Sequence, residues 1–138
     1  MFDISRYYNI FTLGYQKFFS SVFYLISFFY IRIYLIISIG LNLFLWLASY
    51  LIKINVSQDL IVLHYNVDFG VDFIGGVEKI YTIPFLGLII ITINIILLFS
   101  FSRHDNFKFI SNLLLATGAV VNIFLLINLA SIYLINFR

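Results

Sequence analysis

Residues 33–52 read IYLIISIGLNLFLWLASYLI, a stretch of twenty residues without a charge. At about 1.5 Å of rise per residue, a helix of this length matches the ~30 Å hydrocarbon core of a bilayer. Two further stretches, Ile80–Phe101 and Phe109–Phe137, are at least as long and also carry no charge. The sequence therefore predicts an all-α membrane protein with three transmembrane helices, folded as a single membrane domain over residues 1–138.

The overall composition supports this prediction. Hydrophobic residues make up 63% of the chain and charged residues 10%, against about 45–50% and about 25% in ordinary globular domains. The net charge of +2 comes from scattered basic residues, which argues against a nucleic-acid partner. The absence of cysteine excludes disulfides, thiolate nucleophiles and cysteine-ligated metals. No pattern requires a cofactor, and the first predicted partner is the lipid bilayer.

The segment before the first span, residues 3–31, is rich in aromatic side chains. Apolar groups recur there at helical spacing, with Arg6, Asn9 and Gln16 on the opposite side, which predicts an amphipathic helix in the membrane interface. Packing against the protein's own spans or against a partner is the alternative. The run Phe18–Ile31 lacks a signal-peptide cleavage site, so we expect it to be retained, along the interface or as a bent extension.

Charged residues set the ends of the spans and the orientation. An arginine at the bilayer centre costs about 2.5–3.5 kcal/mol on insertion scales, so we expect Arg32 and Lys53 at opposite interfaces. The turn 102–108 carries two basic residues, whereas the segment 54–79 carries four acidic residues and one basic residue. Because Lys and Arg favour the cytoplasmic side, we expect the amino terminus and the turn in the cytoplasm. The 54–79 loop then lies outside the inner membrane.

The 54–79 loop contains a motif unlike the rest of the chain. Residues that favour β-strands alternate with other residues along the stretch Ile61–Val67, which predicts an extended segment. Gly70, Gly75 and Gly76 are expected at turn positions, where glycine can adopt a positive φ. Successive side chains of an extended chain point to opposite sides, so the loop should have one polar and one apolar side. The expected polar side consists of His64, Asn66 and Asp68, and the apolar side of Tyr65, Val67 and Phe69.

Spaced residues of this loop form a recognisable order: histidine, an aromatic residue and asparagine, then glycine, an acidic residue, glycine and lysine, before a proline-led apolar helix. They are His64, Tyr65, Asn66, Gly70, Asp72, Gly75, Lys79 and Pro84. This order resembles the small membrane domain of unknown function at the start of the bacterial sporulation-delay-toxin immunity protein family. The resemblance covers about residues 63–88 and implies that the fold of the loop carries over, with no established chemistry attached.

Three interpretations of the polar loop residues stay open. His64, Asp68 and Asp72 could ligate a divalent cation, although Gly70 is one position too early for an EF-hand. A hydrogen-bonded turn, in which Asp and Asn side chains cap their own backbone, is the interpretation we favour. A partner-binding epitope is the third. Because no nucleophile motif is present, we predict no enzyme and assign no metal site.

Each predicted span also carries an asparagine in or near its middle: Asn42, Asn94 and Asn122. An amide in hydrocarbon finds no water, so it must meet another polar group. We therefore expect the three amides to converge and to hydrogen-bond across the helices. No span contains an ionisable residue of the kind that proton relays use, which favours a structural role over an ion path.

These features predict a non-enzymatic binding or sensing module that presents its motif loop outside the membrane. The predicted binding residues are His64, Asn66, Asp68, Gly70, Asp72, Gly75 and Lys79. The alternative is an accessory structural subunit of a larger membrane complex, in contact with other membrane subunits or with further copies of itself. A small pore built by oligomerisation is a third and weaker hypothesis, because the spans offer little polar surface.

Overall fold

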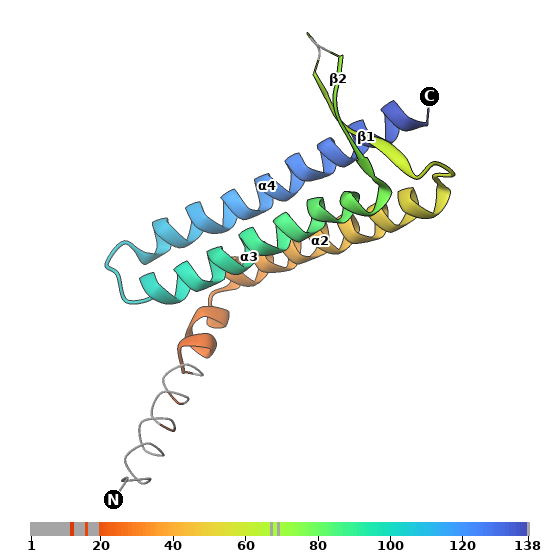
Figure 1. The fold of residues 1–138 in the computed structure, drawn as a ribbon. Coiled ribbons are helices and arrows are strands. Elements are labelled where there is room, and N and C mark those ends of the chain that lie inside the picture. Colours follow the sequence, from red (N-terminus) through yellow and green to blue (C-terminus); the bar gives the residue numbers. More distant parts are fainter. Residues whose placement is uncertain (1–11, 13–15, 17–19, 67, 69, 138) are drawn as a thin grey trace, which may run out of the picture.

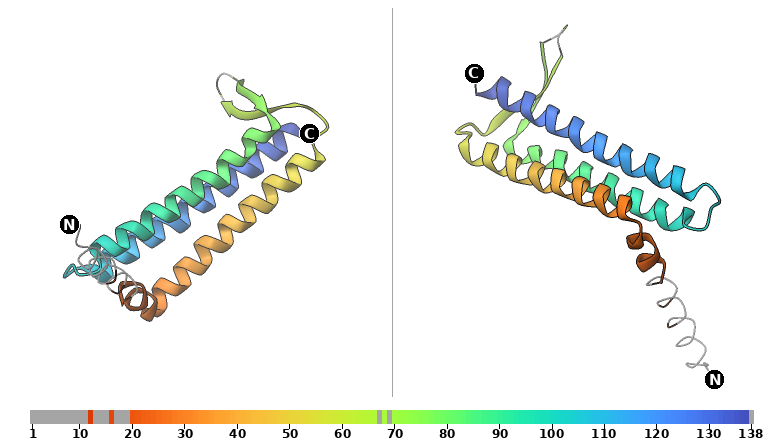
Figure 2. Two further views of the ribbon diagram at one scale, coloured as in Figure 1. Left: turned by 60° about the horizontal axis from the view of Figure 1, so that its bottom comes forward. Right: turned by 180° about the vertical axis from the view of Figure 1, so that it is seen from behind.

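The computed structural model describes residues 12, 16, 20–66, 68 and 70–137. Three long helices lie side by side, with a β-hairpin at one end and a short turn at the other (Figures 1 and 2). In chain order the elements are α2 (Phe29–Asn55), β1 (Leu60–Asn66), β2 (Gly70–Gly76), the 3-10 helix η1 (Val77–Tyr81), α3 (Thr82–Phe101) and α4 (Phe107–Asn136). The helix α3 therefore runs antiparallel to both α2 and α4.

All three helices are long and apolar enough to cross a membrane, which confirms a multi-pass membrane protein in outline. The first helix is longer at both ends than the span predicted for it. Helix α2 extends four residues before Ile33 and three beyond Ile52, so Arg32 and Lys53 lie in its first and last turns. Long basic side chains can reach the interface from such positions, and a helix therefore need not end at its first charge.

The helices pack along a narrow seam. Only 28% of the most apolar window of each helix is buried inside the molecule, so the remainder faces outward. The buried positions recur mostly at steps of three, four or seven residues, as in left-handed coiled coils and many membrane bundles. They are Ile31, Ser38, Asn42, Leu45, Ser49 and Ile52 on α2; Ile83, Pro84, Gly87, Ile91, Asn94 and Leu98 on α3; and Phe107, Ser111, Leu115, Gly118, Ala119, Asn122, Leu129 and Ile132 on α4.

The predicted extracytoplasmic loop contains a two-stranded antiparallel hairpin, so a small β element accompanies the three helices. The strands pair from Leu60 opposite Gly76 to Asn66 opposite Gly70, with irregular register on both sides of His64. Gly70 has φ 79°, as a tight turn requires. Turn conformations at Gly75 and Gly76 were predicted wrongly: both glycines lie within β2 and neither has a positive φ.

The hairpin is anchored at its base rather than along its length. The backbone N–H of Val77 donates to the carbonyl of Asp59 at 3.2 Å. Ile61 is buried in a cluster formed by the hairpin base and the nearby ends of the three helices. The other members of that cluster are Leu45, Ile52, Val77, Ile80, Ile83, Leu129 and Ile132. The strands beyond this base project sideways from the bundle, at a steep angle to the helices and beside the last turns of α4 (Figure 1).

The described part of the amino-terminal segment forms a bent extension of α2. Residues 20–27 are helical, and the chain turns at Phe28, whose backbone is extended. The Tyr24 and Phe28 rings lie 6.1 and 5.7 Å from the Phe107 ring, and Leu25 is buried. The last turns of this segment therefore pack on the bundle itself. The interfacial helix predicted for residues 3–19 lies outside the described residues, apart from Thr12 and Gln16.

Candidate functional site

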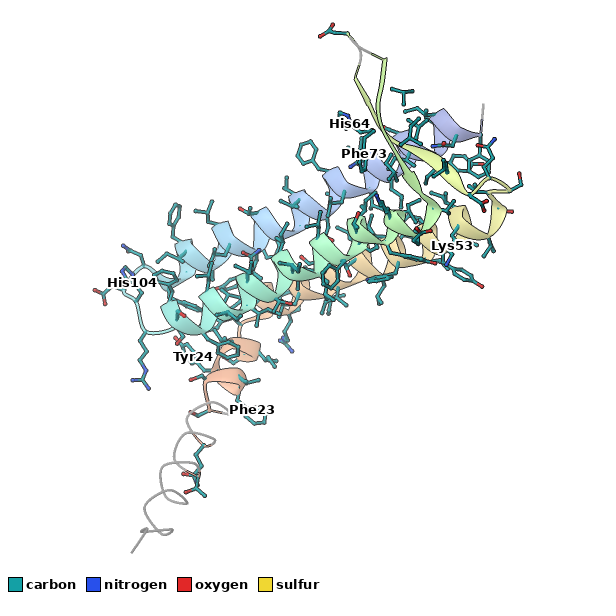
Figure 3. All side chains as sticks on the ribbon, viewed as in Figure 1. Phe23, Tyr24, Lys53, His64, Phe73 and His104 are labelled. Atoms are coloured by element: carbon teal, nitrogen blue, oxygen red, sulfur yellow. The ribbon has the colours of Figure 1, made fainter. Side chains whose placement is uncertain are left out.

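A side chain of α4 holds β1 in place. The amide of Asn136 accepts a hydrogen bond from the Val62 N–H and donates one to the Val62 carbonyl, both at 2.9 Å. The same Nδ2 group also donates to the carbonyl of Ile132 on its own helix at 2.8 Å. The amide thus pairs with the N–H and carbonyl groups of Val62 in the way that the backbone of a third strand would. Figure 3 shows the result, with His64 and Phe73 of the hairpin beside the last turns of α4.

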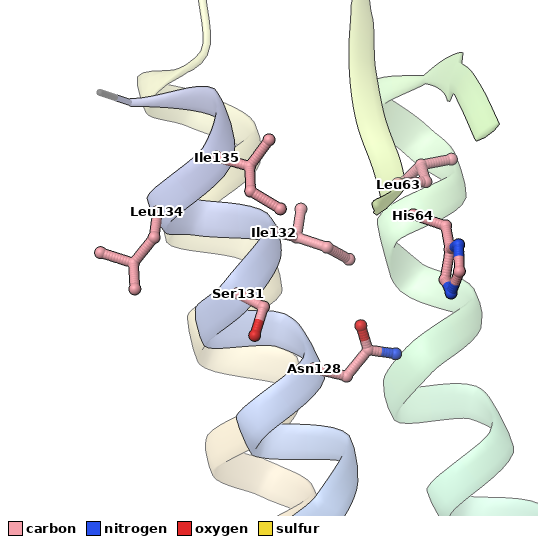
Figure 4. A pocket seen from close by; sticks show the side chains of 7 residues that line it. All are labelled: Leu63, His64, Asn128, Ser131, Ile132, Leu134 and Ile135. Atoms are coloured by element: carbon pink, nitrogen blue, oxygen red, sulfur yellow. The ribbon is translucent and has the colours of Figure 1, made fainter. Parts of the chain in front are cut away.

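This anchoring creates an open groove between β1 and α4, with a volume of about 470 Å³. The groove is lined by Leu63 and His64 from β1 and by Asn128, Ser131, Ile132, Leu134 and Ile135 from α4. In the close view of Figure 4 the imidazole of His64 and the amide of Asn128 lie toward the same end of the groove. The groove therefore combines polar groups with an apolar wall.

The polar groups of the groove can both donate and accept hydrogen bonds. Ser131 donates its hydroxyl hydrogen to the Ile127 carbonyl at 3.0 Å, which leaves its oxygen able to accept. Within the described part of the chain, the exposed amide of Asn128 has no hydrogen-bond partner. The exposed amide of Asn128 can therefore both donate a hydrogen bond to a polar ligand and accept one from it.

Gly75 and Lys79, two of the other predicted loop residues, do not line the groove with His64. Lys79 lies with its Nζ 5.4 Å from the centre of the Phe73 ring. A Cβ added to Gly75 would come within 2.7 Å of Leu63 Cδ1 and 2.9 Å of Lys79 Cδ, so this glycine makes room for both side chains. These residues shape the hairpin base instead of lining the groove.

Asp68 belongs to the turn at the tip of the hairpin, and Gly70 is the first residue of β2, opposite Asn66. The side chains of Asn66 and Asp72 lie outside the described residues, so the expected polar side stays a prediction. Among the side chains that the structure does describe, no group of three His, Cys, Asp or Glu residues could hold a metal ion. The metal, turn and epitope interpretations of the tip therefore all remain predictions.

Two of the three intramembrane asparagines meet as predicted. Asn42 Nδ2 donates to the Pro84 carbonyl at 2.9 Å and lies 3.3 Å from Asn122 Oδ1, while Asn122 donates to the Gly118 carbonyl of its own helix at 2.8 Å. A Cβ on Gly87 would lie 2.6 Å from both amide groups. The pair is thus enclosed by all three helices, and Gly87 supplies the space.

The prediction that Asn94 joins this pair was wrong. Its amide donates instead to the Leu114 carbonyl of α4 at 3.0 Å. It lines a cavity of about 10 Å³ together with Ser38 and Gly118. A Cβ on Gly118 would lie 2.7 Å from Asn94 Nδ2, so a second glycine makes room for a second amide. The Asn42–Asn122 contact and the Asn94 contact are therefore separate rather than parts of one network.

Three polar residues of the groove and its anchor were missed at the level of sequence: Asn128, Ser131 and Asn136. Their signal was present, because three polar residues fall within nine positions near the end of an otherwise apolar helix. The partner on β1 could not be inferred, because register between a hairpin and a helix leaves no pattern in the sequence.

Comparisons with protein-family models, with curated proteins and with solved structures gave no match to this chain.

Proposed function

We propose that this protein is a non-enzymatic binding module that takes a ligand in the groove between β1 and α4. The observation that carries the proposal is the composition of that groove, where His64, Asn128 and Ser131 meet an apolar wall of leucine and isoleucine. Such a lining suits a ligand with one polar and one apolar part.

The orientation belongs to the same proposal. Arg32, Arg103 and Lys108 lie at the end of the bundle opposite the hairpin, while the hairpin end carries most of the acidic residues. By the cytoplasmic preference of Lys and Arg, the turn between α3 and α4 faces the cytoplasm. The hairpin and its groove then face the outside of a bacterial inner membrane.

The test is retention of a bound molecule by the protein purified in mild detergent, read by native mass spectrometry. His64→Ala and Asn128→Ala should each weaken retention by about threefold to tenfold, because each removes one hydrogen-bonding group. Ile74→Ala on β2 and Thr117→Ala on α4 are the matched controls, since both side chains are exposed and neither lines the groove. Equal retention in all four variants would refute the groove as the binding site.

The second candidate is an accessory subunit, and one observation favours it. A groove of about 250 Å³ runs along the outer surface between α2 and α4. It contains Ala48 and Ala130, and small residues of this kind allow the helix of another chain to approach closely. The remaining lining is apolar: Phe44, Leu51, Ile52, Leu126, Leu129 and Tyr133.

This candidate predicts that Ala48→Trp, which fills the α2–α4 groove, removes co-purifying membrane subunits or further copies of the chain. Leu88→Trp is the control, because Leu88 is exposed on α3 and lies outside that groove. Size on native gels and mass spectrometry of the purified material give the readout. If both variants keep the same assembly, the α2–α4 groove is not a subunit contact.

A further inference from the structure

A second polar recess lies at the end of the bundle opposite the hairpin. It has a volume of about 350 Å³ and is lined by Ser20, Ser21, Tyr24, Ser102 and Arg103. The first three come from the helical segment that precedes α2, and the other two from the turn between α3 and α4. Segments about eighty residues apart in the sequence therefore form one site.

The walls of this recess are held by packing that does not involve a ligand. The Tyr24 ring meets the Phe28 ring at 5.1 Å and the Phe107 ring at 6.1 Å. Ser102 donates its hydroxyl hydrogen to the Phe99 carbonyl at 2.8 Å, which fixes the start of the turn. The recess is thus built by the fold, and its hydroxyl groups are placed before anything binds.

The lining has the chemistry of an anion site. Among the residues that the structure describes, the recess is lined by one guanidinium and four hydroxyl-bearing side chains, and by no carboxylate. Arg103 is exposed, and in the described part of the chain it forms no ion pair. Asp105, two residues further along the turn, does not line the recess. A planar guanidinium with neighbouring hydroxyls is well suited to the oxygens of a phosphate group.

The surroundings of the recess point to a lipid as the source of that phosphate. The recess lies where two apolar helices end, at Phe101 of α3 and Phe107 of α4. Phe23 and Ile26, in the same helical turns as Tyr24, are exposed and available to acyl chains. Basic recesses at the ends of membrane helices are typical sites for anionic headgroups. We propose that this recess binds the headgroup phosphate of an anionic phospholipid, with Arg103 as its main contact.

The test uses the full-length protein in mild detergent, titrated with phosphatidylglycerol and read by native mass spectrometry. Arg103→Gln should weaken retention of this lipid by about tenfold or more, because it removes a charge-assisted contact. Lys108→Gln is the control: it removes the same charge near the same turn but from a residue that does not line the recess. Its effect should be small, as for exposed charges in general. An equal loss in both variants would show diffuse attraction to a basic surface and overturn the proposal.

Two further arms separate the lipid from other sources of phosphate. Phosphatidylcholine, which carries a phosphate but no net charge, should be retained more weakly than phosphatidylglycerol by the wild type. Inorganic phosphate should compete poorly, because it lacks acyl chains. Competition by inorganic phosphate at concentrations comparable to those of the lipid would show a soluble ligand and refute the lipid assignment. Melting temperatures of both variants should equal that of the wild type, since both side chains are exposed.

Discussion

At the scale of single residues, the buried amide pair is the most constrained feature of the bundle. Asn42 and Asn122 are 4% and 0% exposed, and both satisfy their amides within the protein. The contact requires Gly87 on the facing helix, because any larger residue would occupy the space of the amides. Two polar groups in hydrocarbon are thereby stabilised by a residue that has no side chain.

Gly87→Ala tests this packing. The added methyl group would lie 2.6 Å from both amide groups, so the helices must separate or the amides must rotate away. We expect a loss of about 1–3 kcal/mol of stability, as in other overpacked interiors. Gly40→Ala is the control, because nothing lies within 4 Å of the position of its new methyl group. Melting in detergent should show a lower Tm for the first variant and an unchanged or slightly higher Tm for the second.

Asn122→Leu tests the hydrogen bonds rather than the space. Leucine has the same number and branching of non-hydrogen side-chain atoms as asparagine, but it removes the acceptor for Asn42 and leaves that amide with the Pro84 carbonyl alone. Interhelical contacts of this kind contribute about 0.6–2 kcal/mol, and a fall in Tm of that size is expected. Asn128→Leu, which removes an exposed amide without a described partner, should leave Tm unchanged. If the two variants melt alike, the amide pair does not stabilise the bundle.

Sequence alone predicted that Asn42 and Asn122 meet, because depth in the membrane can be counted from the ends of each span. The same count failed for Asn94. The apolar helix of the second span begins at Val77 rather than Ile80, because η1 leads directly into α3. The middle of that span therefore moves toward the hairpin end, where Gly87 lies, and Asn94 falls closer to the α3–α4 turn.

At the scale of secondary-structure elements, the hairpin depends on α4. An isolated two-stranded hairpin is only marginally stable in water. Here its base is buried among helix ends, and the amide of Asn136 holds the backbone of Val62. The alternation of Ile61–Val67 predicted the first strand, but the second contains three glycines among its seven residues and was predicted as turns. The pairing with β1 overrides that local preference.

Asn136→Ala should therefore loosen β1 without unfolding the helices. In hydrogen–deuterium exchange, the Val62 amide should exchange faster by about tenfold, because one hydrogen bond and its anchor are lost. Asn55→Ala is the control, since the Asn55 side chain bonds only to the Leu51 carbonyl of its own helix. Protection of Val62 that is equal in both variants would show that the hairpin is held by its apolar base alone.

The spacing of apolar residues also did not predict which faces of the three helices form the seam. The outward faces of the three helices are as apolar as the inward ones, so hydrophobicity shows little contrast around each helix. The buried and outward faces differ instead in their small and amide residues, which recur at heptad-like spacing on the buried face. In a lipid environment such residues identify the interface better than hydrophobicity does.

At the scale of the whole molecule, the two ends of the bundle differ in charge and in shape. The hairpin end presents the groove with His64, and the opposite end presents the recess with Arg103. The sequence predicted three transmembrane helices with charged residues near their ends, because the length of each apolar stretch and the charges that flank it can be read directly from the chain. It could not predict the groove or the recess, since each combines segments that are remote in the chain.

The absence of native cysteine permits a direct test of orientation. A single cysteine replacing Gln58, before the hairpin, should react with a membrane-impermeant maleimide in intact cells. One replacing Asp105, in the α3–α4 turn, should react only after the membrane is opened. Leu98→Cys, in the buried seam, should stay unlabelled in both conditions. The reverse labelling pattern would invert the proposed topology and move the groove to the cytoplasm.

The Asn136 contact has a consequence for self-association of the protein. A hairpin exposed outside the membrane can recruit strands from neighbouring molecules through its two edges. On β1, the position at Val62 is already filled by the Asn136 amide, so sheet growth is blocked there. A substitution at Asn136 would free the backbone of Val62 and so make the β1 edge easier for another strand to pair with.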